Sequence, residues 1–229
     1  MILIILLVVA GIAIYLGSFR IGSRLWCHAL CRAEGCGRKV AITFDDSNDE
    51  QLTPRVLDVL AKHGVEACFF VIGDHASTEI LQRMDREGHI VGNHTLHHAG
   101  MGPFASTQQM IRDARMCDER IEYAIHRRPN LFRPPFGVTN PMIGRMVRAL
   151  DYTVVGWSIR SLDTLSEPRE KVLERIRRRL HAGAIILLHD NREGVAELTD
   201  ALLGMLREER YKVVRVDKLL DITAYKHEA

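Results

Sequence analysis

The sequence predicts a parallel α/β fold, either an open doubly wound sheet or a barrel, preceded by an N-terminal transmembrane helix. Three observations indicate this fold. Seven short apolar runs alternate with helical segments between residues 39 and 222, several runs are apolar almost throughout, and residues 1–19 form a nearly unbroken apolar stretch. Runs of this kind are typical of parallel strands covered on both faces. Because seven units are one fewer than the usual eight, a slightly deficient (β/α) barrel fits best.

The apolar stretch at residues 1–19 is expected to be an uncleaved single-pass membrane anchor. No charged side chain precedes Arg20, and about 18–19 helical residues span roughly 27–29 Å, close to the ~30 Å hydrocarbon core. A cleaved signal peptide is the main rival, but a basic start and a clear small-x-small cleavage site are missing. Arg20, Arg24 and Arg32 follow the stretch, so the positive-inside rule favours a cytoplasmic body.

The segment at residues 20–38 is expected to be juxtamembrane. It gathers Cys27, Cys31 and Cys36 with His28. Zinc binding is one interpretation, but the spacing matches no usual knuckle, and free or lipidated thiols are the alternative. The odd total of five cysteines fits a reducing compartment better than a disulfide framework.

The body at residues 39–222 is predicted as one domain, followed by a tail at 223–229. Helix starts are indicated by capping residues and first-turn prolines, and several helix ends by glycine. The predicted strands are 40–44, 68–72, 89–93, 131–133, 153–157, 184–188 and 212–216. The predicted helices begin near Thr53, Ser77, Ser106, Asn140, Ser166 and Val195, and those with marked ends stop near Gly64, Gly88, His126, Gly183 and Arg210.

Composition excludes several classes of function. Lys and Arg total 31 against 29 Asp and Glu, a formal charge of +2, whereas a dedicated nucleic-acid binder has a concentrated basic surplus. The charged fraction of 26% and the lack of low-complexity runs argue against extended disorder. Aromatic residues make up 6% of the chain, too few for a sugar-binding platform built mainly on stacking.

Polar side chains collect where the predicted strands end. The active sites of parallel α/β folds lie at the carboxyl ends of the strands, and five of the seven ends carry a titratable or cationic residue. These residues are Asp45 and Asp46, His94 and His98, Arg133, Asp163, and His189 with Asp190.

The pair Asp45–Asp46 directly follows a buried strand. Two carboxylates are costly to bury there unless a cation or a proton satisfies them. His94 and His98 are four residues apart, a spacing that places both rings on one face of a helical turn. With an aspartate from another strand end they form an Asp-His-His set that suits Zn²⁺, although Co²⁺, Ni²⁺ or Fe²⁺ also fit. His97 is a competing ligand that the spacing disfavours.

Three further residues extend the expected site. Thr95 is placed to orient a ligand by a hydrogen bond. Arg133 precedes two rigid prolines and is suited to hold a carboxylate. His189 exchanges a proton near neutral pH, and Asp163 is expected to pair with Arg133 or to tune His189.

Four motifs resemble those of NodB-like polysaccharide deacetylases, carbohydrate esterase family 4. The motifs are Thr43-Phe44-Asp45-Asp46, His94-Thr95-Leu96-His97-His98, Arg133-Pro134-Pro135-Phe136 and Leu187-Leu188-His189. They occur in the family's order across residues 39–222. The resemblance implies a distorted (β/α)7 barrel of the NodB-homology type and metal-dependent hydrolysis of an N-acetyl group on an amino sugar.

The resemblance also implies roles for single residues. Asp46, His94 and His98 match the metal ligands, and the metal is expected to be one divalent ion, Zn²⁺ first. Asp45 matches the general base, Arg133 its orienting partner and His189 the general acid.

The sequence departs from the family's pattern near the substrate groove. Phe136 replaces the usual tyrosine but keeps a backbone N–H for the oxyanion. In the fourth motif, which begins at Trp157, Arg160 and Thr164 stand where Asp and Trp are usual, and Asp163 remains as the carboxylate. Phe136 and Trp157 are expected to contact the substrate, which differs from long chitin or peptidoglycan strands.

The expected partner is therefore an acylated amino sugar in a glycan or glycoconjugate, with the membrane as a second partner and no nucleic acid. One rival is a deformylase or deacetylase of a polyprenyl-linked amino sugar. Another is a non-catalytic, membrane-tethered glycan-binding protein. Charge and cysteine count favour a cytoplasmic catalytic domain, whereas family precedent favours an extracytoplasmic one.

Overall fold

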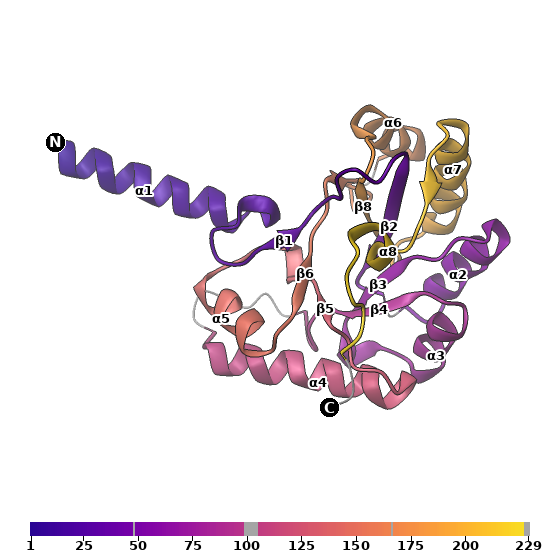
Figure 1. Ribbon diagram of the computed structural model, residues 1–229, viewed down its shortest axis with the longest axis horizontal. Helices are drawn as coiled ribbons and strands as arrows, with labels where there is room; N and C mark the ends of the chain where they lie inside the picture. Colours follow the sequence, from indigo (N-terminus) through magenta and orange to yellow (C-terminus); the bar gives the residue numbers. More distant parts are fainter. Residues whose placement is uncertain (48, 99–104, 166, 227–229) are drawn as a thin grey trace.

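The computed structural model describes residues 1–47, 49–98, 105–165 and 167–226, and within them nine parallel strands form one curled sheet (Figure 1). The strand order is β1-β6-β5-β4-β3-β2-β8-β7, and β9 pairs with the start of β2. The strands are β1 (Ala29–Leu30), β2 (Lys39–Asp45), β3 (Cys68–Val71), β4 (Ile90–Asn93), β5 (Leu131–Phe132), β6 (Thr153–Val155), β7 (Ile159–Arg160), β8 (Ile185–His189) and β9 (Lys212–Val213).

The sheet is a half-barrel whose open side is crossed by a single segment, residues 153–160. This segment starts as β6, which pairs with β5 and β1, and ends as β7, which pairs with β8. The Gly156 N–H donates to the Leu30 carbonyl, and the Ser158 N–H donates to the Ile185 carbonyl. The parallel α/β prediction is confirmed, and the seven-strand count is corrected. Both β1 and β7 have two residues, too few to show a strand pattern.

Alternation along the strands sorts side chains into two layers. On β2, Val40, Ile42 and Phe44 belong to the large core beneath the helices, whereas Ala41 belongs to a second cluster inside the curl. Successive side chains of a strand point to opposite faces. The same parity sends Thr43 and Asp45 into the half-barrel, towards the edge where the strands end.

The helices flank this sheet. They are α1 (Ile2–Ser18), α2 (Leu52–His63), α3 (Thr78–Arg86), α4 (Thr107–Ile125), α5 (Pro141–Ala149), α6 (Arg169–Arg179), α7 (Val195–Glu208) and α8 (Val216–Leu220), with 3₁₀ turns η1 (Ile21–Ser23), η2 (Gly73–His75) and η3 (Pro135–Gly137). Ser106 forms the predicted capping box with Gln109, and Asn140 caps α5 as predicted. The expected start at Ser166 lies outside the described residues.

Two helix predictions are corrected. The residue before α2 is Gln51, and the Asp49 carboxylate accepts the N–H groups of Gln51 and Leu52. Thr53, the predicted N-cap, instead donates its hydroxyl hydrogen to Asp190. The strand predicted at 212–216 stops at Val213, and α8 begins at Val216.

Helix α1 projects from the body (Figure 1), and its apolar side chains are largely exposed. The expected transmembrane anchor is not supported, because no helix in the described ranges is both long and apolar enough to cross a membrane. The segment after α1, expected to be juxtamembrane, contributes β1 to the sheet.

Candidate active site

A buried ion pair lies inside the half-barrel. Arg133 directly follows β5 and is fully buried. Its Nη1 donates to Asp45 Oδ1 at 2.6 Å and to Thr43 Oγ1 at 2.9 Å. Its Nε and Nη2 donate to the carbonyls of Val155 and Gly156, each at 2.9 Å. A buried charge pair is tolerated when hydrogen bonds satisfy it in this way, and the arrangement fixes one oxygen of Asp45.

The three expected metal ligands come together at the rim beside this pair. Asp46 Oδ1 lies 3.3 Å from His98 Nε2 and 3.6 Å from His94 Nε2. One ligand atom of each residue lies within 4.8 Å of those of the other two. Asp46 follows β2 and has a φ of 63°, which turns its side chain from the strand towards the histidines. Asp45 Oδ2 is 3.8 Å from His94 Nε2.

The histidine pair is positioned by a loop, and the expected helical turn is absent from the described residues 94–98. Thr95 and His98 have φ values of 72° and 47°. His94 Nδ1 pairs with the Arg133 carbonyl oxygen at 2.7 Å, which leaves Nε2 facing the site. The Thr95 hydroxyl accepts the His98 N–H at 3.1 Å. His97 turns away and pairs with Asp113 at 2.6 Å.

These residues fit a divalent ion. Asp46 Oδ1 is buried and has no hydrogen-bond partner among the described residues, and such an oxygen is costly unless something satisfies it. Burial and the neighbouring His94 lower the pKa of His98, which keeps its ring neutral and available as a ligand. One carboxylate oxygen and two imidazole nitrogens form a donor set that suits zinc and similar metals.

His189 stands at the end of β8, in register with Asp45 on the neighbouring strand. The ring Nδ1 of His189 pairs with Asp163 Oδ1 at 2.9 Å, and the backbone N–H of His189 donates to Asp163 Oδ2 at 2.7 Å. Burial opposes the charged form of His189, but the hydrogen bond and charge of Asp163 outweigh burial and raise the pKa of His189. Burial likewise opposes ionisation of Asp163, yet the contacts with His189 hold its pKa below the usual range. Of the two partners expected for Asp163, the structure therefore selects His189.

Phe136 and Trp157 border the site. Phe136 has a φ of 60°, and its ring meets the His98 ring edge-on at 4.7 Å between centroids. Trp157 lies beneath Arg133, with 5.5 Å between the guanidinium carbon and the ring centroid. Gly137 separates them; a Cβ at this position would lie 2.4 Å from the Trp157 ring. Phe136 therefore lies next to a candidate metal ligand, and Trp157 lies next to the arginine that holds Asp45.

The structure adds a buried acid that sequence reasoning left without a role. Asp190 follows His189, accepts a hydrogen bond from Thr53 at 2.8 Å, and is fully buried. Burial raises the pKa of Asp190 to about 7. Its position in the chain drew attention to it, but nothing in the sequence indicated that the side chain of Thr53, in the first turn of α2, would donate to it.

The cysteines near the N-terminus do not form the zinc site considered from the sequence. Across the described part of the chain, only one group of at least three His, Cys, Asp or Glu residues is placed to share a metal ion, and it consists of Asp46, His94 and His98. Cys27 and Cys31 pack against the core beside β1, and burial raises the pKa of both thiols.

Comparisons with known proteins agree with this geometry. A family model described as polysaccharide deacetylase matches residues 32–155. The chain is 31% identical over 190 residues to the peptidoglycan-N-acetylmuramic acid deacetylase PdaA of Bacillus subtilis, covering 80% of this chain and 72% of that protein. It is 31% identical over 195 residues to a peptidoglycan-N-acetylglucosamine deacetylase of Bacillus cereus, covering 82% and 89%.

A solved structure is similar as well. The family 4 acetyl xylan esterase from Clostridium thermocellum, determined in complex with a cobalt ion, superimposes with a TM-score of 0.72 at 32% identity. The match covers 79% of this chain and 89% of the esterase.

Proposed function

We propose that this chain, which belongs to the polysaccharide deacetylase family of hydrolases, removes N-linked acetyl or similar acyl groups from an amino sugar of a glycan by a metal-dependent reaction. One observation carries the proposal: Asp46, His94 and His98 bring their ligand atoms together directly beside an aspartate whose second oxygen faces them. A divalent ion held by the three residues would supply Lewis-acid activation of water and of the acyl oxygen.

Asp45 is the proposed general base. Arg133 occupies Oδ1, so Oδ2 is the oxygen directed towards His94. The guanidinium fixes the orientation of the Asp45 carboxylate. Asp45 is thereby placed to take a proton from a water molecule at the site, since a base must lie within hydrogen-bond reach of the proton it removes.

His189 is the proposed general acid. Asp163 occupies Nδ1, which leaves Nε2 as the nitrogen that gives a proton to the departing amine. That amine is a very poor leaving group unless it is protonated in this way. We assign the backbone N–H of Phe136 to the developing oxyanion, and Trp157 to the wall that contacts the sugar.

The residues at the site support catalysis over the non-catalytic alternative, because a binding module has no need for a paired base, a paired acid and three clustered ligands. The polyprenyl-linked alternative depended on a spanning anchor, which the described residues do not provide. Zn²⁺ remains our first choice of metal, with Co²⁺, Ni²⁺ and Fe²⁺ as alternatives.

The test combines metal analysis with an assay of acetate release. The full chain is stripped with a chelator, reloaded with each of the four metals, and incubated with chito-oligosaccharides and with peptidoglycan. Asp45→Asn should keep the metal and lose nearly all turnover. The matched control is Asp151→Asn, an exposed position with a φ of 49° that asparagine tolerates. A wild-type chain that binds no metal, or an active Asp45→Asn variant, would overturn the proposal.

A further inference from the structure

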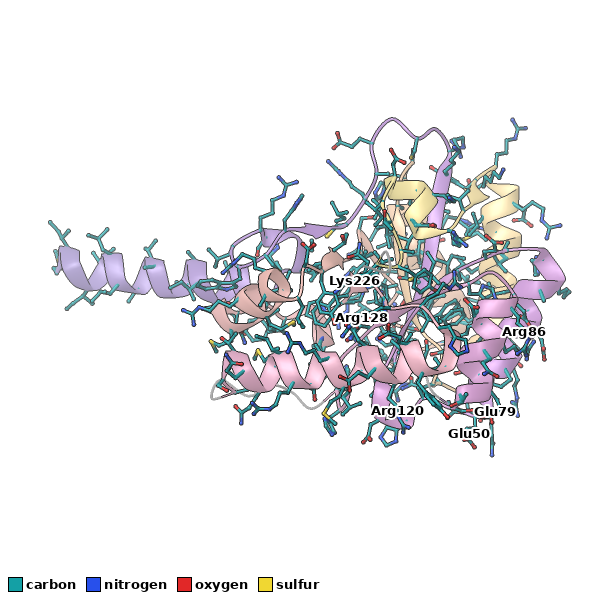
Figure 2. All side chains as sticks on the ribbon, turned by 60° about the horizontal axis from the view of Figure 1, so that its bottom comes forward. Glu50, Glu79, Arg86, Arg120, Arg128 and Lys226 are labelled. Carbon is teal, nitrogen blue, oxygen red and sulfur yellow. The ribbon has the colours of Figure 1, made fainter. Side chains whose placement is uncertain are left out.

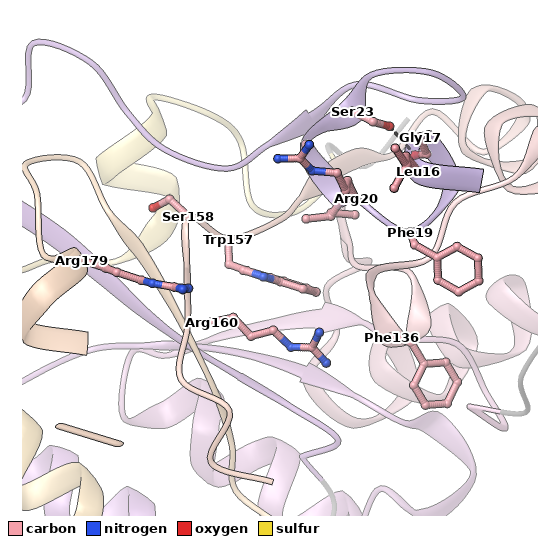
Figure 3. A pocket seen from close by; sticks show the side chains of 12 residues that line it. Leu16, Gly17, Phe19, Arg20, Ser23, Phe136, Trp157, Ser158, Arg160 and Arg179 are labelled. Atoms are coloured by element: carbon pink, nitrogen blue, oxygen red, sulfur yellow. Dashed lines mark hydrogen bonds between the residues drawn. The ribbon is translucent and has the colours of Figure 1, made fainter. Parts of the chain in front are cut away.

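A groove of about 710 Å³ opens next to the candidate active site (Figure 3). One wall is the end of α1 with η1, and the other comes from the segment 157–160 and the end of α6. Phe136 and Trp157 line the groove. The Phe136 ring also contacts the ring of His98, a candidate metal ligand, and Trp157 lies beneath Arg133. An occupant of this groove therefore lies beside the reacting group.

The wall formed by α1 is fixed to the body. The Thr139 N–H donates to the Ser18 carbonyl at 2.8 Å, and the Trp26 indole N–H donates to the Ser18 hydroxyl at 2.9 Å. The Ser23 hydroxyl donates to the Gly17 carbonyl. These bonds hold the last turn of α1 and the following turn in place, so the groove is part of the folded body.

Three arginines from separate segments of the chain line this groove. Arg20 follows α1, Arg160 ends β7, and Arg179 ends α6. In Figure 3 their side chains are arranged around the indole of Trp157. The described lining residues include no Asp or Glu, so the groove presents positive charge without a compensating carboxylate.

These three side chains have no carboxylate partner within the described residues, and the guanidinium carbon of Arg160 lies 6.0 Å from the centroid of the Trp157 ring. None of them takes part in an ion pair or donates a side-chain hydrogen bond there. Other arginines of α6 are paired: Arg175 with Glu167, and Arg178 with Glu174 at 2.8 Å. Like charges gathered without counter-charges raise the local potential and attract an anion.

We infer that the groove binds an anionic substituent, a carboxylate or a phosphate, carried by the glycan substrate. The inference rests on the proposed function and narrows its substrate class to acidic N-acylated glycans, in preference to neutral polymers. Guanidinium groups bind both anions by paired hydrogen bonds. Trp157 and Phe136 supply apolar faces for the adjoining sugar ring.

The expected preference is moderate because all three arginines are exposed. An exposed charge pair contributes about 0.2–1 kcal/mol, which corresponds to roughly 1.5- to 5-fold in affinity per arginine. Removal of all three should therefore reduce binding of an acidic probe by roughly 3- to 125-fold and leave a neutral probe within about twofold.

The test uses the full chain and matched probes. The carboxylate arm compares a tetrasaccharide of alternating N-acetylglucosamine and N-acetylmuramic acid with the same compound after reduction of its carboxylates to alcohols. The phosphate arm compares chitotetraose 1-phosphate with chitotetraose. The variants are Arg160→Gln and the triple variant Arg20→Gln/Arg160→Gln/Arg179→Gln. The control is Arg86→Gln, an exposed arginine on α3, distant from α1 and the groove (Figure 2).

Two readouts separate this inference from the proposed function. In acetate release, the wild type should show a lower KM for an acidic probe than for its neutral counterpart, and the triple variant should lose that difference with little change in kcat. Calorimetric titration of the same probes measures binding whether or not they are hydrolysed. If no probe is deacetylated, the proposed function fails, yet tighter binding of an acidic probe that the triple variant abolishes still supports the groove. Equal binding of acidic and neutral probes by the wild type, or a preference that persists in the folded triple variant, overturns it.

Discussion

Replacement of Arg133 by methionine should destabilise the protein more than any change at an exposed arginine. The guanidinium makes four hydrogen bonds inside the half-barrel, to Asp45, Thr43 and the carbonyls of Val155 and Gly156. Breaking a buried ion pair by removing one partner costs about 3–5 kcal/mol, since the other charge stays buried. Each orphaned carbonyl adds about 1 kcal/mol or more. The total is comparable with the whole free energy of unfolding of many domains, about 5–15 kcal/mol.

The assay is equilibrium unfolding in urea, followed by tryptophan fluorescence. A double variant, Arg133→Met/Asp45→Asn, separates the cost of the unpaired Asp45 charge from the cost of the two carbonyls that lose their hydrogen bonds. Because the amide that replaces the Asp45 carboxylate carries no charge, the double variant should be less destabilised than the sum of the two single changes, with a coupling of about 2 kcal/mol or more. Arg86→Met on α3 is the control and should change stability by less than about 0.5 kcal/mol. An Arg133→Met variant within about 1 kcal/mol of the wild type would refute the reasoning.

Two further predictions follow from the buried titratable groups. Asp163→Asn removes the charge that raises the pKa of His189. Because His189 must be protonated to act as the general acid, the alkaline limb of the pH profile of kcat should move to lower pH. A limb that does not move would contradict the assignment of His189 as the general acid. Burial raises the pKa of Asp190 to about 7, so the native state binds the carboxyl proton of Asp190 more tightly than the unfolded state does. The stabilising contribution of this proton is full below about pH 4 and is lost as the pH rises to about 7. In metal-free protein, Asp190→Asn should therefore gain thermal stability relative to the wild type as the pH rises from about 4 to about 7, and a difference in Tm that stays constant over this range would count against it.

The polar residues named at the ends of the predicted strands meet in the structure, whereas parts of the sheet around them were missed. Asp45 and His189 could be located because each ends a strand whose apolar pattern is readable, whereas Arg133 follows a two-residue strand and was singled out by the two prolines after it. Strand parity then sends all three side chains to the same interior. β1 and β7 escaped prediction because each has two residues and depends on neighbours distant in the sequence. The strand predicted at 212–216 was too long because Val214 and Val216 continue the apolar run that starts with β9, whereas α8, which begins at Val216, was not predicted.

At the candidate site, the loop geometry could not be predicted from the sequence. The i, i+4 spacing of His94 and His98 predicted that the two rings lie close together, and they do, but a helical turn does not bring them together. Left-handed backbone at Thr95 and His98 does so, and such single residues have no reliable sequence signal outside glycine and asparagine. The groove was hidden for a different reason: Arg20, Arg160 and Arg179 are far apart in the sequence, and their convergence follows only from the fold.

Arg133 connects the two halves of the proposed mechanism through different parts of the same residue. Its side chain fixes the oxygen Oδ1 of Asp45, whereas its backbone carbonyl receives His94 Nδ1 and so sets the direction of the ligand nitrogen. A substitution removes the first contact and keeps the second, because the carbonyl belongs to the chain itself. The two contacts require two directions at residue 133. The side chain must point into the half-barrel, and the carbonyl must point towards the loop that carries His94. The two prolines that follow satisfy both demands by restricting the backbone to extended conformations, and this explains how a buried base and a metal ligand from different strands keep a fixed separation.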